Sequence, residues 1–270
     1  MSALWPNQLL VSLSTENIAV IYRTFLTKRT INHRHHSFTE HSEQDWRVAT
    51  QQLDNILVSL KLPTNTQLHL TLASDLVRYL TLPPQKEVMR QAEKLAYANA
   101  AYHEVYGVIA GNWLVKCHDA APKQTTVATA IDQILFESIQ ELALKYKLKL
   151  KTIQPYLMRV FNRLDRYIDK SNAFLAIVEY NRLLLVKLQK GECQQIRSLK
   201  LSSDWQSMLN QMLYRETLLG DCDEREVLVY APSQKNYTLD PAKNWHLKRI
   251  NVTGKKINNE LPYAMLETLA

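Results

Sequence analysis

The sequence is poor in glycine, in cysteine and in long apolar runs. Its 270 residues include only 5 glycines, against an average of about 7%, which disfavours loops that hold phosphate through glycine backbone amides. No run approaches eighteen apolar residues, and no basic segment precedes the apolar residues near the N-terminus. Neither a membrane span nor a secretion signal is therefore predicted, and we expect a cytoplasmic protein.

The three cysteines, Cys117, Cys193 and Cys222, are odd in number and far apart. This spacing argues against a disulfide framework or a zinc site and fits reduced thiols. The chain carries 33 Lys and Arg against 26 Asp and Glu, for a formal net charge of +7. Such a charge permits an acidic partner, anionic lipid or nucleic acid, but the basic residues are spread along the whole chain. That spread favours solvated faces over one binding tract.

The segment from residue 68 to residue 107 is the part around which the chain is organised. Leucines alternate with polar residues up to Leu72, and a second alternating run ends at Pro83-Pro84, which neither a strand nor a helix carries in its interior. A helix is predicted to begin at about Gln85 and to stop at Gly107. Its inner face is expected to carry Val88, Ala92, Leu95, Ala96 and Asn99.

Ahead of this segment the pattern predicts the order β-β-β-α-β. Three short strands lie between residues 8 and 38, and a helix opened by a capping box of Ser42 and Asp45 runs up to Pro63. After the segment, two strands lead to a helix that Thr129 and Asp132 can cap. Lysines alternate with apolar residues over 145–151, which predicts an exposed edge strand.

Pro155 opens a further helix, whose outer side is expected to carry Arg159, Arg163 and Arg166. From Asn172 the opening order of elements returns, with three strands, a helix that starts at Ser203, two strands and a last short helix at Pro262. The sequence therefore predicts an α/β protein of two β-β-β-α-β halves in tandem, with an insertion in the first half.

This order of elements resembles the cytoplasmic pilus-assembly proteins of the PilM type and the cytoplasmic part of the secretion protein GspL. The resemblance implies an actin-like fold of two tandem ribonuclease-H-like halves of mixed β-sheet flanked by helices, with a small α+β subdomain inserted in the first half. The expected parts are residues 1–84, the inserted subdomain at 85–128, the remainder of the first half with a crossover helix at 129–170, and the second half at 171–270.

Nucleotide-binding members of this fold hold phosphates in two hairpin turns, one in each half. Where the family pattern of the first turn has Asp, Gly and a following Lys, this sequence has Ser12, Ser14 and Ala19. The metal-binding carboxylate and the counter-charge for a phosphate are thus missing from the first turn, although its hydroxyl groups could touch a phosphate.

The second turn and the adenosine loop depart from the family pattern in the same direction. Glu179, Tyr180 and Asn181 replace a glycine- and hydroxyl-rich turn, and Ala231-Pro232 stands where a double glycine is expected. Together these losses leave the phosphate charges without metal, backbone amides or lysine, at a cost of several kcal/mol. We therefore expect a pseudo-ATPase that has no catalytic residues and needs no cofactor.

Other chemistry finds no better support. A ribonuclease-H nuclease needs a carboxylate cluster for two metal ions, and the corresponding strand positions carry Ser12 and a lone Glu179, which we interpret as an exposed carboxylate beside a turn. The histidine run has no cysteine or carboxylate at fixed ligand spacing, so solvated histidines are favoured over a metal site. This run comprises His33, His35, His36 and His41.

A peptide-binding cleft is predicted between the first half and the insertion. Tyrosines of the helix after Pro84 can form its wall, although tyrosines on a helix are also common at the rim of a core. In proteins of the PilM type this region receives the short cytoplasmic tail of an inner-membrane partner, which implies the same region here. The candidate cleft residues are Arg78, Tyr79, Arg90, Tyr97 and Tyr102.

The resemblance favours a non-catalytic cytoplasmic scaffold that links a PilN-like inner-membrane platform protein to an assembly ATPase, in machinery like that of type IV pili or type II secretion. Attachment to the membrane is expected only through a partner, and no nucleic acid is expected. Two alternatives stay open. One is a divergent ATP-dependent enzyme of the actin and sugar-kinase fold, and the other is a basic ribonuclease-H-like module that binds nucleic acid.

Overall fold

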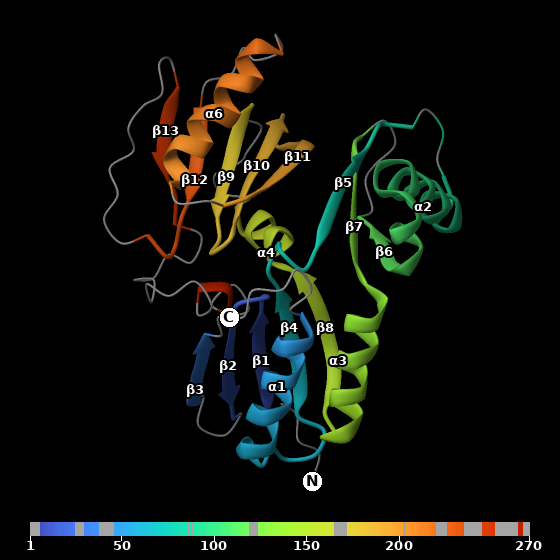
Figure 1. Ribbon diagram of the computed structural model, residues 1–270, viewed down its shortest axis with the longest axis vertical. Helices are drawn as coiled ribbons and strands as arrows, with labels where there is room; N and C mark the ends of the chain where they lie inside the picture. Colours follow the sequence, from blue (N-terminus) through green and yellow to red (C-terminus); the bar gives the residue numbers. More distant parts are fainter. Residues whose placement is uncertain are drawn as a thin grey trace. The chain divides into compact units, whose positions relative to one another are not determined.

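The computed structural model divides into two compact units (Figure 1). Unit 1 comprises Met1–Val77, Ile131–Val160 and Glu260–Ala270, and unit 2 comprises Arg78–Ala130 and Phe161–Asn259. The structure describes residues 6–24, 30–37, 46–85, 87, 89–118, 124–164, 172–201, 204–219, 226–234, 245–251 and 264–266. The sequence predictions that involve Ser42, Asp45, Val88, Arg166, Ser203 and Pro262 lie outside these residues, as do His41 and Cys222.

A mixed sheet of five strands, in the order β3-β2-β1-β4-β8, forms the centre of unit 1. Its strands are β1 (Gln8–Leu13), β2 (Asn17–Arg23), β3 (Thr30–Ser37), β4 (Gln67–Leu72) and β8 (Lys149–Pro155). The pairs β1/β2 and β2/β3 are antiparallel, whereas β1/β4 and β4/β8 are parallel. β1 and β2 are buried over nearly their whole length, as their continuous apolar runs require.

Two helices, α1 (Trp46–Leu60) and α3 (Gln133–Lys145), lie side by side against this sheet (Figure 1). The Asp132 carboxylate caps α3 by accepting from the Ile134 backbone N–H at 2.8 Å, as the sequence predicts. The two helices are joined by Lys145 Nζ, which lies 2.8 Å from Asp54 Oδ1. Hydrogen bonds from Lys145 and Tyr146 lower the pKa of the Asp54 carboxyl.

The strand β8 lies at one edge of the sheet, as the alternating lysines predict, but it begins at Lys149, and Lys145 belongs to α3. Lys149 and Lys151 on this strand are exposed. The helix α4 (Tyr156–Arg163) follows directly after Pro155, also as predicted. The expected outer position of Arg159 is wrong, because this side chain is only 8% exposed and lies among the buried residues of α4.

The larger sheet of unit 2 has the order β11-β10-β9-β12-β13. Its strands are β9 (Ala173–Val178), β10 (Arg182–Gln189), β11 (Glu192–Lys200), β12 (Glu226–Tyr230) and β13 (His246–Arg249). As in the sheet of unit 1, the first two pairs (β11/β10 and β10/β9) are antiparallel and the last two (β9/β12 and β12/β13) are parallel. The helix α6 (Trp205–Leu218) buries Trp205, Leu209 and Leu213 in one apolar cluster with residues of β9, β10 and β12.

Unit 2 also contains a small sheet in the order β5-β7-β6, covered by the helix α2. The elements are β5 (Arg78–Leu82), α2 (Gln91–Tyr106), the 3-10 helix η1 (Gly107–Asn112), β6 (Trp113–Cys117) and β7 (Thr126–Asp132). Leu82, Ala98, Tyr102, Val115 and Ala128 are among its buried core residues.

The predicted start and the predicted inner face of α2 are both wrong. The helix begins at Gln91 and not at Gln85, and the Arg90 backbone N–H at its start donates to Glu93 Oε2 at 2.8 Å. Leu95 is 37% exposed, whereas Ala98 and Tyr102 are fully buried. The helix thus turns small and aromatic residues toward the sheet, and the predicted stop at Gly107 is correct.

Within the part of the chain that the structure describes, no helix combines the length and the apolar character that a passage through a membrane requires.

Candidate functional site

The turn between β1 and β2 carries Ser14, one of the residues at the expected first phosphate turn. The Ser14 hydroxyl accepts from the Asn17 backbone N–H at 2.8 Å and from the Glu16 backbone N–H at 3.3 Å, and it donates to the Asn17 carbonyl at 3.1 Å. The Ser14 side chain is 7% exposed. Its hydroxyl group is thus engaged by the turn itself.

The carboxylate of Asp75 reaches the same turn from the bend that follows β4. Its Oδ2 atom accepts from the Thr15 backbone N–H at 2.9 Å and from the Thr15 hydroxyl at 2.6 Å. The bend is held against the turn because the Ala73 backbone N–H donates to the Leu13 carbonyl at 2.9 Å. The Asp75 carboxylate thus accepts the hydrogen bonds of the Thr15 N–H and O–H groups.

An internal carboxylate at this place works against a bound phosphate in two ways. It takes up the N–H and O–H groups that would otherwise point at the phosphate, and it repels a second anion. Two unit charges about 4 Å apart repel by about 1 kcal/mol in water and by about 4 kcal/mol at the effective dielectric of a protein surface. Asp75 is 8% exposed, so water screens its charge only in part.

The other two positions of the predicted first turn lie in the sheet. Ser12 and Ala19 are direct partners in the β1/β2 register, and they are 1% and 0% exposed. Ala19 packs in a small apolar cluster with Leu10, Ile21 and Leu266. Both positions are therefore interior positions of unit 1.

The turn between β9 and β10 is short and tightly bonded. The Glu179 backbone N–H donates to the Arg182 carbonyl at 2.8 Å, and the Leu201 backbone N–H donates to the Asn181 carbonyl at 2.7 Å. Tyr180 is 38% exposed. The interpretation of Glu179 as an exposed carboxylate is wrong, because its side chain is only 2% exposed.

The residues at the expected adenosine loop are also interior. Ala231 and Pro232 follow the end of β12 and are both buried, and Ala231 belongs to the same apolar cluster as Trp205 and Val229. The Gln234 backbone N–H donates to the Ala231 carbonyl at 3.2 Å and closes a turn there. A buried methyl group and a proline ring occupy the place of the double glycine.

The candidate cleft residues divide into buried and accessible ones. Tyr102 is fully buried, and its hydroxyl lies within hydrogen-bond distance of the Arg78 carbonyl (2.9 Å) and the Ala128 carbonyl (3.0 Å). Burial raises the pKa of the Tyr102 hydroxyl. Tyr79 is 8% exposed, Arg78 and Tyr97 are half-buried, and Arg90 is exposed. Tyr102 is therefore a core residue, and Arg90 and Tyr97 are the cleft candidates that a peptide can reach.

Sequence reasoning missed Asp75 as a site residue. The signal is the polar break between the two alternating runs around Leu72 and Leu76, but nothing in the sequence names Thr15 as its partner. Among the described residues, no group of three or more histidine, cysteine, aspartate or glutamate side chains is arranged to hold a metal ion. Of the histidine run, His33, His35 and His36 lie on β3.

Three solved structures share the architecture of this chain over nearly its whole length. The cytoplasmic domain of EpsL, an inner-membrane component of the type II secretion system of Vibrio cholerae, aligns with 97% of this chain and 94% of its own, at a TM-score of 0.59 and 12% identity. A Bacteroides thetaiotaomicron protein with an actin-like ATPase fold aligns with 97% and 95%, at a TM-score of 0.59 and 14% identity.

The third structure is the PilM-PilN type IV pilus biogenesis complex, in which the aligned chain covers 91% of this chain and 88% of its own, at a TM-score of 0.61 and 10% identity. No protein-family model matches the sequence, and no curated protein matches it either. The chain has the actin-like ATPase fold, in the form that it shares with EpsL and PilM.

Proposed function

We propose that this chain is a non-catalytic scaffold protein that works at the cytoplasmic face of an inner membrane, in machinery like that of type II secretion or type IV pili. Two of the structures that share its fold come from such machinery. A fold that has two packed sheets but no working phosphate turns keeps rigid surfaces, which suit the docking of other proteins.

The observation that carries this proposal is the pair of hydrogen bonds from Thr15 to Asp75. A nucleotide-binding turn keeps its backbone donors available for a phosphate. In this turn the Thr15 backbone N–H donates to the Asp75 carboxylate, and the Glu16 and Asn17 backbone N–H groups donate to the Ser14 hydroxyl. Because the second turn is held by its own backbone and its glutamate is buried, the second sheet offers no substitute.

The proposal includes a finer description of the fold. The five-stranded sheets are two ribonuclease-H-like halves, and the small sheet with α2 is a subdomain inserted in the first half. The proposed boundaries are residues 1–84, 85–128, 129–170 and 171–270. The repeated strand order of the two large sheets supports this description.

The proposed partner is a short cytoplasmic segment of a PilN-like inner-membrane protein, and an assembly ATPase is the proposed second partner. The segment would contact the region of α2 and β5 through the accessible side chains of Arg90 and Tyr97, with Arg78 beside them. The presence of PilN in the PilM-PilN complex supports this assignment. Membrane attachment would then come through the partner.

Thermal unfolding with and without Mg-ATP tests the non-catalytic assignment. A ligand at a hundred times its dissociation constant adds about 2.7 kcal/mol to the free energy of unfolding, so we expect no shift of the Tm and no release of phosphate. Stabilisation by Mg-ATP, or hydrolysis of it, would refute the assignment.

The partner assignment has its own test. A labelled peptide from the cytoplasmic segment of a single-span membrane protein encoded beside this chain should bind it, and Arg90→Glu should weaken the binding. Lys248→Glu, which makes the same charge change at an exposed position of β13, serves as the matched control. Equal binding to both variants would place the contact elsewhere.

A further inference from the structure

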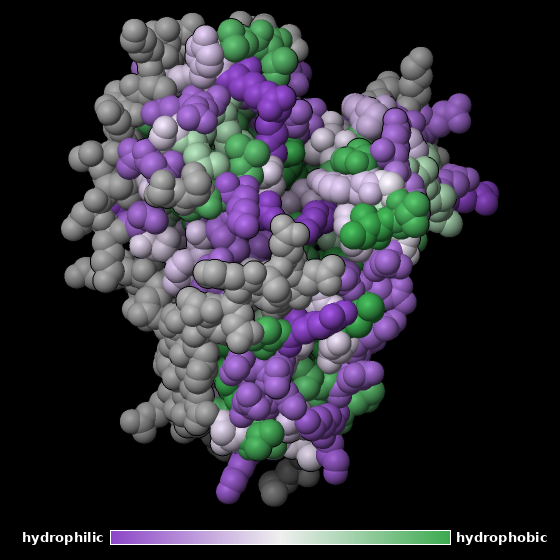
Figure 2. Space-filling model, in the orientation of Figure 1, coloured by the Kyte–Doolittle hydropathy of each residue, from purple (hydrophilic) through white to green (hydrophobic). Residues whose placement is uncertain are grey.

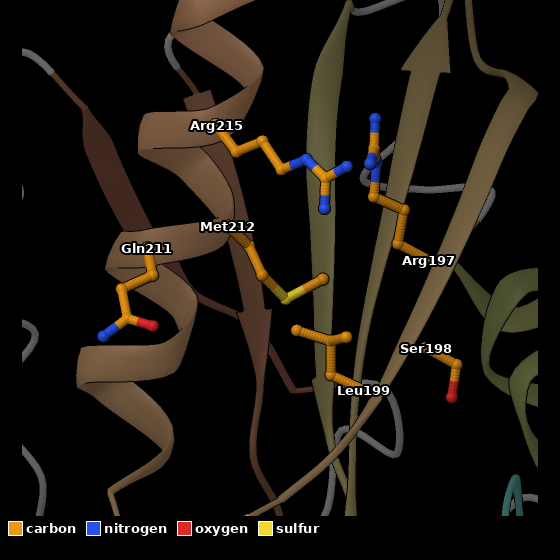
Figure 3. Close-up of a pocket in the computed structure, with 6 residues that line it drawn as sticks. All are labelled: Arg197, Ser198, Leu199, Gln211, Met212 and Arg215. Atoms are coloured by element: carbon orange, nitrogen blue, oxygen red, sulfur yellow. The ribbon is translucent and has the colours of Figure 1, made fainter.

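A hollow of about 440 Å³ lies between the edge strand β11 and the helix α6 in unit 2 (Figure 3). Met212 and Leu199 form its apolar floor, with exposed fractions of 5% and 43%. Arg197 from the strand and Arg215 from the helix also line it, and Figure 3 shows both guanidinium groups at the same end of the hollow. Gln211 completes the lining on the side of the helix.

The described side chains at this hollow carry a net positive charge. Arg197 Nε lies 2.7 Å from Oε1 of the buried Glu216, which fixes one arginine in the wall. Arg215 forms no ion pair within the part of the chain that the structure describes. Among the described residues, two arginines therefore face one carboxylate at this hollow. Arg215 is exposed and has no ion-pair partner among the described residues, so its guanidinium can bind a carboxylate ligand through two N–H groups.

The accessible surface is longer than a small molecule needs. A second hollow of about 450 Å³ adjoins the first at Gln211 and continues along α6 past Ser207 and Asn210 to Asp204. On the same helix Tyr214 is 65% exposed and Leu218 is 68% exposed. Hydrophobic and hydrophilic side chains both reach the visible surface over α6 (Figure 2). Such a mixed, elongated strip is typical of a surface that binds a stretch of polypeptide.

The first residues of β11 are already occupied by their own unit. The Gln124 side chain donates to the Glu192 carboxylate, and the Thr125 hydroxyl donates to Gln194 Oε1 at 2.8 Å. The half of β11 that carries Arg197 and Leu199 is the half beside the hollow. Because these two residues are two positions apart on a strand, they share one face of the sheet, and that face meets α6.

We propose that the strip along β11 and α6 binds an acidic segment of a partner protein. An aspartate or glutamate of the segment would pair with Arg215, and an adjacent apolar side chain would rest on Met212 and Leu199. The lining of this strip includes none of the proposed partner contacts Arg78, Arg90 and Tyr97, and the proposal does not depend on the function proposed above. The arginines at one end of the strip favour an acidic segment. Asp204 at the other end would repel the successive phosphates of a nucleic acid.

The test is a selection of random dodecapeptides displayed on phage against the full chain, followed by fluorescence anisotropy with the recovered peptides. We expect recovered sequences that place an acidic residue next to an apolar one. Arg215→Glu should weaken their binding about 10- to 100-fold, the loss expected for a charge-assisted hydrogen bond. Leu199→Ser should weaken it several-fold by removing part of the apolar floor.

Lys116→Glu is the matched control, because it makes the same charge change at an exposed position of β6 that does not line the hollow, and it should leave the affinity within twofold. Urea denaturation of each variant shows whether it is folded.

Failure to recover any binding sequence, recovery of basic sequences, or affinity that Arg215→Glu leaves unchanged would overturn the proposal. Binding of single-stranded DNA that Arg215→Glu abolishes would overturn it in favour of a nucleic-acid site, and glutarate binding as tight as that of the peptides would favour a small-molecule site.

Discussion

Asp75 and Thr15 lie sixty positions apart in the chain, and both hydrogen bonds between them converge on one carboxylate oxygen. The contact joins the turn of the β1/β2 hairpin to the bend after β4. It places a negative charge at the turn where a phosphate is expected in the nucleotide-binding form of the fold. The same contact also ties two strand ends of unit 1 together, so it contributes to stability.

Replacing this carboxylate should destabilise unit 1. Asp75→Asn keeps the shape of the side chain but removes the charge, so the two charge-assisted hydrogen bonds from Thr15 weaken. We expect a loss of about 1.5–3 kcal/mol in the free energy of unfolding, measured by urea denaturation. Glu141→Gln, at an exposed position of α3, removes the same charge and should change the stability by less than about 0.5 kcal/mol. Equal losses in both variants would show that the contact with Thr15 does not stabilise the fold.

The hydroxyl group of Tyr102 should matter more to stability than that of Tyr106. Tyr102→Phe leaves the carbonyls of Arg78 and Ala128 without this donor in a buried site, and we expect a cost of about 1–3 kcal/mol. Tyr106 is 38% exposed and stacks on Tyr102 at a ring distance of 6.0 Å. Tyr106→Phe keeps this stacking, so its Tm should stay close to that of the parent protein. A larger loss for Tyr106→Phe would contradict the assignment of Tyr102 to the core.

Two glycines of η1 should respond differently to alanine. Gly107 ends α2 with φ +71° and ψ −151°, a conformation that is nearly exclusive to glycine. A Cβ atom there would meet nothing within 4 Å, so Gly107→Ala tests backbone strain alone, at an expected cost of about 1–3 kcal/mol. Gly111 has no positive φ, and its Cβ would make an ordinary contact of 3.5 Å with His103. Gly111→Ala should therefore be neutral within about 0.5 kcal/mol in the same denaturation assay.

The stability of the chain should fall in mild acid, in part because of His69. Burial, with Arg159 and Lys151 nearby, lowers the pKa of His69 below its ordinary value of 6.5. The unfolded chain therefore takes up this proton first as the pH falls. The contribution of His69 is complete above about pH 6.5 and is lost as the pH drops through the pKa of the folded state.

Urea midpoints between pH 7.5 and 5.0 measure this dependence. His69→Gln should flatten it, whereas His118→Gln, at an exposed position after β6, should leave it unchanged. A parent protein whose midpoint rises toward pH 5 would contradict the role given to His69.

The strands were predictable because their signal is local. Alternating or continuous apolar residues place β1, β2, β4, β9 and β10 without any tertiary information. The burial of polar groups was not predictable, since it depends on partners that are distant in the sequence. Arg159 and Glu179 are interior although their residue types favour the surface, and Tyr102 can be interior because its hydroxyl lies within hydrogen-bond distance of two backbone carbonyls. The displaced start of α2 has a local origin, because the helix is capped by the contact between Arg90 and Glu93, three residues apart, and does not begin directly after the prolines.

The lysines of β8 oppose edge-to-edge pairing between copies of this protein. An edge strand offers backbone donors and acceptors that can join with the same edge of a second molecule. Such a union would bring Lys149 and Lys151 of both copies into one seam, where four like charges would repel. Concentrated solutions should therefore resist growth into continuous ribbons, and the edge can stay open without making the protein prone to aggregate.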